Sequence, residues 1–241
     1  MSRQITTLTF FKYPTLKGKI WAFGMMQFAH GYLQKVKGLE FYKLMGSGKG
    51  MGFNPLPDWS IYSLLQVWDY EEVALDFIEQ SDLMKKYRKN SSEQWTIFMK
   101  NITAHGEWSG NNPFLKDDTI DANEGPIAVI TRATIKTKYL RTFWKYVPTS
   151  EKPLVNNQNL IYTKGIGEIP AIQMATFSLW KNLEAVKQFA YHSKEHMEAI
   201  RKTRQLGWYK EELFSRFKPY KQLGTWGGVE KDLSEQLQSL S

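Results

Sequence analysis

The sequence contains no cysteine. This absence excludes disulfide bonds, thiolate-ligated haem, cysteine-bound iron–sulfur clusters and a cysteine nucleophile. Because proteins of reducing compartments rarely use disulfides, we expect a cytoplasmic protein. The sequence also lacks a run of about 18 apolar residues, the minimum for a helix that crosses a bilayer, and its first residues lack the apolar core of a signal peptide.

Uninterrupted basic tracts are missing too, although the net charge is +8. Lys and Arg are interspersed with carboxylates, as in Lys194-Glu195 and Lys210-Glu211-Glu212. Nucleic-acid-binding proteins concentrate their basic residues in a patch or stripe, so we expect no nucleic-acid partner. A basic face suits anionic lipid or the acidic groups of a cofactor, and we expect a peripheral contact with the inner membrane.

Large apolar side chains, in contrast, are plentiful. Hydrophobic residues make up 42% of the 241 residues and aromatic residues 15%. A chain of this length and composition can form a packed core, in one large domain or two small ones.

The first part of the chain alternates between strand-like and helix-like segments. Runs rich in β-branched and aromatic residues predict strands at 5–13, 39–45, 61–68 and 94–103. Helical patterns lie between them, at 20–35, 70–80 and 81–89. The resulting order, β-α-β-β-α-β, is that of a ferredoxin-like unit.

The same order recurs after a polar, turn-rich segment at 111–125. Strands are predicted at 126–135, 159–164, 173–180 and within 208–220, with helices at 138–146, 182–191 and 194–205. We therefore predict an α+β protein made of two ferredoxin-like repeats, 1–115 and 116–241, whose four-stranded sheets pack into a barrel.

Short internal similarities support a duplication. Aligning Trp68 with Trp180 places Phe77 on Phe189 and Ser81 on Ser193. The sequences GEWSG (106–110) and GTWGG (224–228) close the two halves.

Two glycine-rich segments follow the second strand of each repeat, GSGKGMGF (46–53) and GIG (165–167). The first is not a Walker A loop, because Lys49 is followed by Gly50 rather than Ser or Thr. Gly46 and Gly48 would allow the backbone to approach a cofactor or substrate closely, and a tight turn is the alternative interpretation. We expect the two segments to occupy related positions around one cleft.

The stretch 189–217 contains the most suggestive arrangement of polar residues. Ser193 is a candidate N-cap for a helix that ends before Gly207. His196 lies on the semi-apolar face of this helix, with Arg201 and Arg204 on an adjacent face. An imidazole beside two guanidinium groups suits an iron porphyrin, which needs an axial base and cations for its propionates. The alternative is a surface or capping histidine.

Several long segments resemble the spheroidene monooxygenase family, haem-binding carotenoid ketolases of dimeric α/β-barrel type. The residues that carry the resemblance are FYKLMGSGKGMGFNPLPDW (41–59), EQWTIFMKNITAHGEWSGNNPF (93–114), VITRATI (129–135), GIGEIP (165–170), ATFSLW (175–180) and FAYHSKEHMEAIRKTRQLGWYKEELFSRF (189–217).

This resemblance implies a haem b enzyme that inserts oxygen into an extended apolar, carotenoid-like substrate with electrons from a ferredoxin-like donor. It implies His196 as the iron ligand, because this residue matches the family's histidine. We expect Arg201, Arg204 or Arg132 to neutralise the propionates, and Gly46 and Gly48 to border the cofactor.

Three further points stay open from the sequence. The catalytic residues are unknown, with His30 and Ser47 as distal candidates. A homodimer is one option for the oligomeric state. Two alternative functions remain: a haem enzyme with dehydratase or peroxidase-like chemistry, or a haem-free binding module, because fold and cofactor do not fix the reaction.

Overall fold

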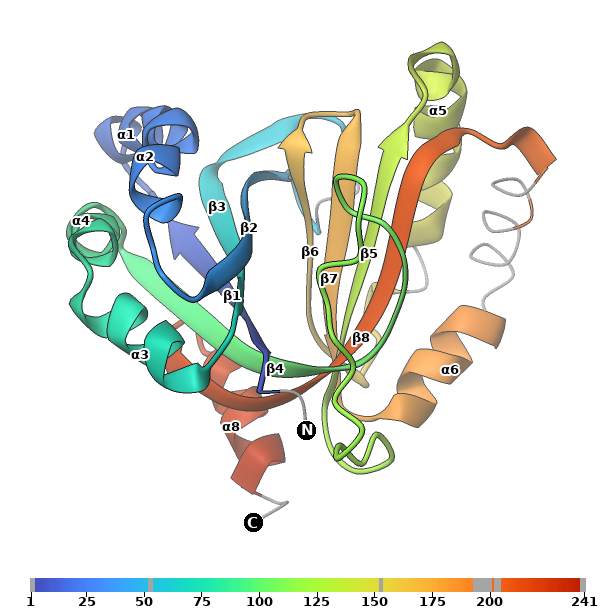
Figure 1. Ribbon diagram of the computed structural model, residues 1–241. Coiled ribbons are helices and arrows are strands. Elements are labelled where there is room, and N and C mark those ends of the chain that lie inside the picture. Colours follow the sequence, from blue (N-terminus) through green and yellow to red (C-terminus); the bar gives the residue numbers. More distant parts are fainter. Residues whose placement is uncertain (1–2, 52–53, 152–153, 193–200, 202–204, 239–241) are drawn as a thin grey trace.

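The computed structural model describes residues 3–51, 54–151, 154–192, 201 and 205–238 (Figure 1). The first half consists of β1 (Ile5–Lys12), α1 (Leu16–Phe28), α2 (His30–Leu33), β2 (Leu39–Gly48), β3 (Pro57–Trp68), α3 (Glu71–Gln80), α4 (Asp82–Asn90) and β4 (Glu93–Gly106). The second half consists of β5 (Ile127–Ile135), η1 (Thr137–Tyr139), α5 (Leu140–Glu151), β6 (Leu160–Ile169), β7 (Gln173–Trp180), α6 (Leu183–His192), β8 (Tyr209–Gly224) and α8 (Val229–Gln238).

The eight strands form one closed antiparallel barrel in the order β1-β3-β2-β6-β7-β5-β8-β4. The chain is therefore a mixed α/β protein, and the predicted barrel is confirmed. Around the barrel, β4-β1-β3-β2 from the first half meets β8-β5-β7-β6 from the second, so both halves have the same strand order. In Figure 1 the helices of the first half lie on one side of the barrel and α5 and α6 on the opposite side.

Two details of geometry repeat between the halves. The rings of Trp68 and Phe77 are 5.1 Å apart, and those of Trp180 and Phe189 are also 5.1 Å apart. Gly106 and Gly224 end β4 and β8 with φ values of 94° and 90°. Such positive φ angles are readily adopted only by glycine, which explains the shared residue type.

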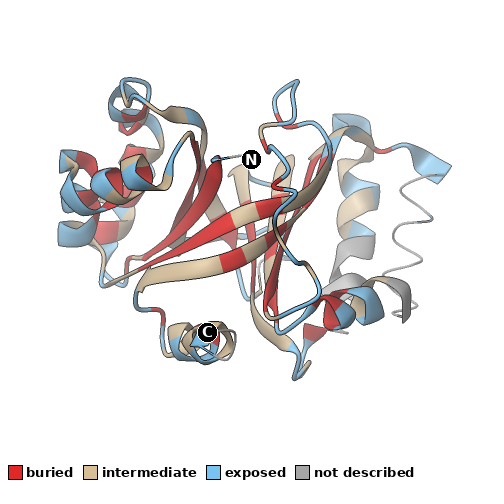
Figure 2. Cartoon of the chain, turned by 60° about the horizontal axis from the view of Figure 1, so that its bottom comes forward, coloured by how far each residue is buried: buried red, intermediate tan, exposed pale blue. Residues whose placement is uncertain are grey.

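Large apolar side chains fill the barrel. Residues that point inward include Leu8 and Phe10 of β1, and the tryptophans of the two closing segments, Trp108 and Trp226, join the same cluster. A second cluster lies between the sheet of the first half and its helices, with Phe11, Leu64 and Phe98 on the sheet. Figure 2 shows the resulting pattern: buried residues line the strands and the inner sides of the helices.

Among the described residues, the structure differs from the prediction in two elements, β2 and α8. Gly46, Ser47 and Gly48 belong to β2 rather than to a loop, because β2 continues far enough to pair with β6, a partner distant in sequence. The helix α8 was not predicted. Most of the helix predicted at 194–205 lies outside the described residues. No described helix is long and apolar enough to span a membrane.

Candidate functional site

We define the C-terminal outer face as the side of β5, β6, β7 and β8 that points away from the barrel. Across its centre, Phe214 of β8 pairs with Thr131 of β5, Thr131 with Thr176 of β7, and Thr176 with Gly165 of β6. Residues paired across antiparallel strands share a face, so these four lie in one row. Thr131 is exposed, and the Phe214 side chain is 38% exposed.

At several positions the equivalent face of the first half carries larger side chains, whereas Phe214 stands where the first half has the smaller Thr96. Ile5 pairs with Trp68 as Ile127 pairs with Trp180, which aligns the two sheets. Under this alignment the small residues of the C-terminal outer face replace large ones. Ala133 takes the place of Phe11, Thr176 of Leu64 and Gly165 of Leu44. The cationic Arg216 stands where the first half has Phe98.

This replacement changes burial as well as volume. Thr9, the counterpart of Thr131, is fully buried under the helices of the first half, whereas Thr131 is exposed. Removing large side chains from one of two otherwise similar surfaces leaves room for a bound group.

Arg216 and Lys218 of β8 lie on the same outer face, and each has a buried nitrogen with no hydrogen-bond partner among the described residues. These atoms are the Nε of Arg216 and the Nζ of Lys218. Burial lowers the pKa of the Lys218 ammonium, and the nearby carboxylates of Asp121 and Glu124 oppose this effect. Buried cationic donors without partners cost free energy, so they suit an anionic ligand such as a carboxylate.

The walls of the site come from both halves. Leu183, Val186 and Phe189 of α6 pack against Trp180 beside the C-terminal outer face. From the first half, Met51 packs against the same cluster, and its carbonyl accepts a hydrogen bond from the amide of Gly165 at 2.6 Å. The first glycine-rich segment therefore borders this face.

The principal predicted haem residues fall mostly outside what the structure describes. His196 and Arg204 lie outside the described residues, as does the side chain of His192. Arg201 is described and is exposed. Within the described ranges, no three His, Asp or Glu side chains are grouped so that they could hold a metal ion.

The predicted glycines lie at the junction of the halves. Gly46 pairs with Gly167 and Ser47 with Ile166, so the two glycine-rich segments meet as neighbouring strands. The Ser47 hydroxyl, a distal candidate, is buried and donates to the carbonyl of Ile61 at 2.9 Å. Gly48 ends β2 opposite Pro57.

His30, the other distal candidate, lies in α2 among the helices of the first half. Its Nδ1 is 2.9 Å from the hydroxyl of Tyr42. The C-terminal outer face is on the opposite side of the barrel (Figure 1), so the structure does not bring His30 and Arg216 together.

Arg132 points into the barrel, away from Arg216. Its side chain is 2% exposed, forms an ion pair with Glu211, and lies 3.9 Å from a carboxylate oxygen of Glu168. The Arg132 guanidinium lies over the ring of Trp108, 5.7 Å from its centroid, and the indole N–H of Trp108 donates to Glu168 at 2.7 Å. Burial lowers the pKa of Arg132, and the carboxylate of Glu168 opposes this effect.

The end of the barrel that contains Arg132 and Glu168 has further ion pairs. Lys43 contacts Glu168 at 2.6 Å, and Lys164 contacts Asp58 at 3.2 Å. Lys164 also donates to the carbonyl of Gly50 at 2.7 Å. Sequence reasoning missed this group because its members come from strands far apart in the chain. Alternation gives the face of a strand residue but not its neighbours.

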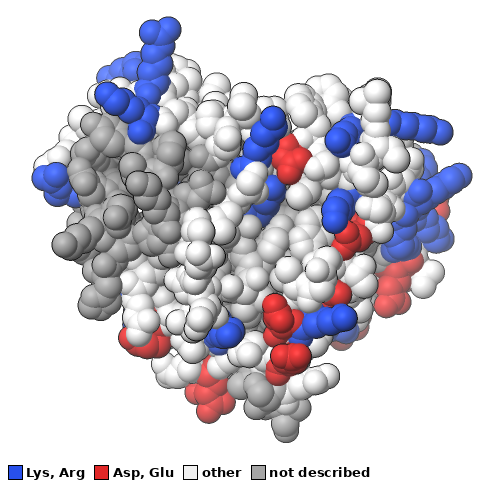
Figure 3. All heavy atoms as spheres, turned by 180° about the vertical axis from the view of Figure 1, so that it is seen from behind, with Lys and Arg blue, Asp and Glu red and all other residues white. Residues whose placement is uncertain are grey.

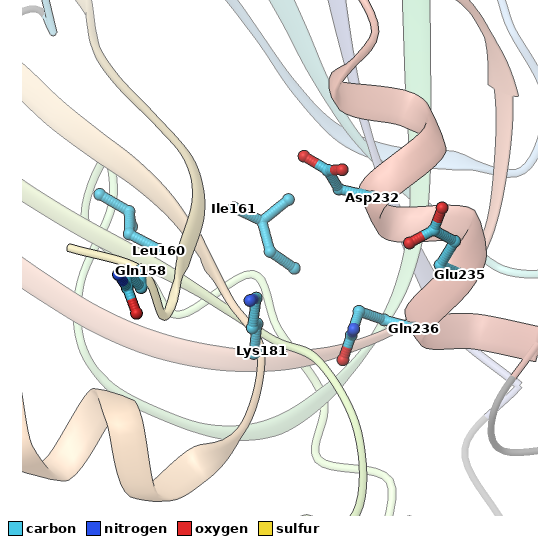
Figure 4. A pocket seen from close by; sticks show the side chains of 7 residues that line it. All are labelled: Gln158, Leu160, Ile161, Lys181, Asp232, Glu235 and Gln236. Carbon is cyan, nitrogen blue, oxygen red and sulfur yellow. The ribbon is translucent and has the colours of Figure 1, made fainter. Parts of the chain in front are cut away.

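A depression with a polar lining lies where α8 covers the opposite end of the barrel (Figure 4). It lies between α8 and the starts of β6 and α6, and its lining residues are Gln158, Leu160, Ile161, Lys181, Asp232, Glu235 and Gln236. With mostly charged and amide side chains, it does not match an extended apolar substrate.

Comparison with known proteins gives strong sequence matches. A spheroidene monooxygenase from Cereibacter sphaeroides is 34% identical over 230 residues, covering 93% of this chain and 69% of that relative. One from Rhodobacter capsulatus is 32% identical over 235 residues, covering 97% and 98%. One from Rubrivivax gelatinosus is 29% identical over 212 residues. No family model matches the sequence.

Among solved structures, two aldoxime dehydratases, one in complex with butyraldoxime, resemble this chain with TM-scores of 0.62 and 0.59. Each match covers 92% of this chain, and the matches cover 81% and 83% of the dehydratases. The sequence identity is 10% in both, so this likeness concerns the fold alone.

Proposed function

Since this chain belongs to the spheroidene monooxygenase family, we propose that it is a haem-dependent monooxygenase of an extended apolar, carotenoid-like substrate. An oxygenase follows from the family. The haem and the substrate class are our addition.

The observation that supports a bound cofactor is the loss of side-chain volume on the C-terminal outer face. Ala133, Thr176 and Gly165 stand where the first half has Phe11, Leu64 and Leu44. A flat macrocycle needs such a surface, with apolar contacts and cations for its propionates. The apolar side chains of α6 fit these needs, as do the donors of Arg216 and Lys218 that have no partner among the described residues.

In this proposal His196 would bind the haem iron through one ring nitrogen, and its other ring nitrogen would donate to a hydrogen-bond acceptor of the protein. Arg201, Arg204 and Arg216 neutralise the propionates. Arg132 is left out of this set, because it lies on the inner face of the sheet, with Glu211 as its partner. Haem, when bound, supplies the activation of oxygen.

The protein's own groups would position the substrate. Met51 and the glycine-rich segment around Gly46 and Gly48 border the C-terminal outer face, so they would contact the apolar substrate and keep water from it. We further propose a ferredoxin-like electron donor and a cytoplasmic location; a homodimer stays one option for the oligomeric state.

We also propose that the fold arose by duplication of a ferredoxin-like unit, with repeats at 1–115 and 116–241. Its support is the repeated strand order, the matched Trp–Phe ring contacts and the matched backbone at Gly106 and Gly224.

The absorption spectrum of the purified protein, with haem supplied during expression, tests the proposal. Wild type should show a Soret band with about one haem per chain, and His196→Ala should lose that band while keeping the fold. His30→Ala is the matched control and should keep the spectrum. If His196→Ala retains haem with an unchanged spectrum, the ligand assignment is wrong.

The reaction is tested separately. After reduction by dithionite, addition of oxygen and a carotenoid should give an oxygenated carotenoid. A haem protein that leaves the carotenoid unchanged but dehydrates an aldoxime would favour dehydratase chemistry. A protein that never binds haem would favour the binding module.

A further inference from the structure

The helix α1 exposes an apolar stripe to solvent. Leu16, Ile20 and Phe28 follow one another at multiples of four residues, and Phe23 lies beside them. Their exposed fractions are 74%, 65%, 70% and 59%. The opposite side of α1 is buried through Gly18, Ala22 and Met25. A surface helix normally presents polar residues to water, so this outward stripe needs a partner.

The stripe continues onto neighbouring elements. Trp59 of β3, 49% exposed, places its ring 5.4 Å from that of Phe23. Next to it, Leu56 is also exposed. Tyr32 of α2 is exposed and lines a shallow depression with Gly31, Lys35 and Val36. Exposed Trp and Tyr rings are typical of the interface between a membrane and water.

Basic residues surround this surface. Residues 1–39 contain six Lys and Arg side chains and no Asp or Glu, and one of the six, Lys12, forms an ion pair with Glu93. Lys17 and Lys19 lie within α1 itself, and Lys86 of α4 stacks over the ring of Tyr32. In Figure 3, which views the molecule from behind, Lys and Arg side chains lie along the right-hand edge, where the helices of the first half lie, with Asp and Glu side chains beside and below them.

We propose that this face, formed by α1, α2 and the exposed tip around Trp59, docks the protein on an anionic lipid bilayer. With 13 residues, α1 is too short to cross a bilayer and would lie in its interface, with the stripe among the acyl chains and the lysines at the headgroups. This inference goes beyond the proposed function and depends on neither haem nor substrate.

Two other occupants fit less well. An acidic protein would match the lysines but would leave the exposed apolar residues of α1 and Trp59 unexplained. A second copy of this chain would bring two basic surfaces together, which costs free energy through like-charge repulsion. A lipid surface with negative headgroups satisfies both the stripe and the charge.

Sedimentation with vesicles tests the proposal. The full chain should bind vesicles that contain phosphatidylglycerol, and bind more weakly to pure phosphatidylcholine or at high salt, where headgroup attraction is screened. Changing Ile20, Phe23 and Phe28 to Ser should lower the vesicle partition coefficient about tenfold or more. Changing Lys17 and Lys19 to Glu should abolish the preference for phosphatidylglycerol.

Matched controls distinguish binding through this face from nonspecific hydrophobic adsorption and from an effect of net charge. Leu115, Val155 and Ile169 are exposed apolar residues elsewhere, and changing all three to Ser should leave vesicle binding unchanged. Lys116→Glu with Lys231→Glu matches the charge change of the lysine variant. The proposal is overturned if the wild-type protein does not bind the vesicles, or if the stripe variant binds them as tightly as the wild type and the control variant do. It is also overturned if the stripe variant changes only the oligomeric state measured by ultracentrifugation.

Discussion

Gly46 of β2 lies directly opposite Gly167 of β6, at the junction where the two halves of the barrel meet. The two residues are also counterparts. Gly46 pairs with Tyr62 of β3 as Gly167 pairs with Met174 of β7. The two glycines therefore hold equivalent positions in the two halves and pair with each other, and both glycine-rich segments contribute to this junction.

The two glycines differ in the space around them, and this difference gives the first prediction. A Cβ added to Gly167 would lie 2.5 Å from the carbonyl oxygen of Gln173, whereas one added to Gly46 would meet nothing within 4 Å. Gly167→Ala should lower the free energy of unfolding by about 2 kcal/mol, since the backbone must move. Gly46→Ala is the control and should unfold like wild type. Equal melting temperatures for both variants would contradict the prediction.

The second prediction concerns the C-terminal outer face and rests on the proposed haem. Thr176→Leu restores the residue type of its counterpart Leu64 and should fill part of the space for the macrocycle. We expect haem affinity to fall about tenfold, because the added atoms must be displaced or strained. The melting temperature of the haem-free protein should not fall. Thr176→Ser adds no bulk and should bind haem normally. Full haem occupancy in Thr176→Leu would exclude this face as the site.

Arg132 gives the third prediction. Arg132→Met would leave Glu211 and Glu168 without their buried cation, so the free energy of unfolding at pH 7 should fall by about 3–5 kcal/mol. Arg141→Met, at an exposed position of α5, should change stability little. Thermal unfolding measures both. A variant Arg132→Met with normal stability and lost haem would instead assign Arg132 to the propionates.

The fourth prediction concerns pH. Burial raises the pKa of the Asp58 carboxyl, but hydrogen bonds from Ser60 and the charge of Lys164 outweigh it and hold that pKa below its usual 3.8. Because the folded-state pKa is the lower one, this stabilisation is present above pH 3.8 and is lost as the pH falls through the lowered value.

Asp58→Asn should therefore cost about 2 kcal/mol at pH 7, and the difference from wild type should shrink as the pH falls below 3.8. Asp82, whose side chain is 85% exposed, provides the control variant Asp82→Asn. Denaturant unfolding across this pH range measures the effect. A difference from wild type that is independent of pH would show that the charge of Asp58 is not the cause.

The sequence by itself predicted the order of the eight strands and of the helices between them, but not α8, because alternation of apolar residues and helical periodicity are local properties of the chain. It also predicted a barrel through two sets of four strands, and the match of Trp68 with Trp180 led to the hypothesis of an internal repeat. Long segments such as 41–59 and 189–217 carried the resemblance to the family, and the identity to its members over most of the chain confirmed it. Local patterns failed where β2 continues through Gly48, because its pairing with β6 is not visible in the sequence of either strand.

Only the tertiary structure decided which residues meet. The alternation of β5 left the face of Arg132 open, and its ion pair with Glu211 of β8 places it inside the barrel. Thr176 and Leu64 are recognised as counterparts only from the strand pairings, because β7 pairs with β5 in the same register in which β3 pairs with β1. The exposure of Phe23 and Phe28 likewise could be seen only in the packed structure. From the sequence alone, a helix rich in apolar residues is expected to be buried. Sequence determines what each segment can form, whereas long-range packing determines which surfaces are filled and which remain free to bind.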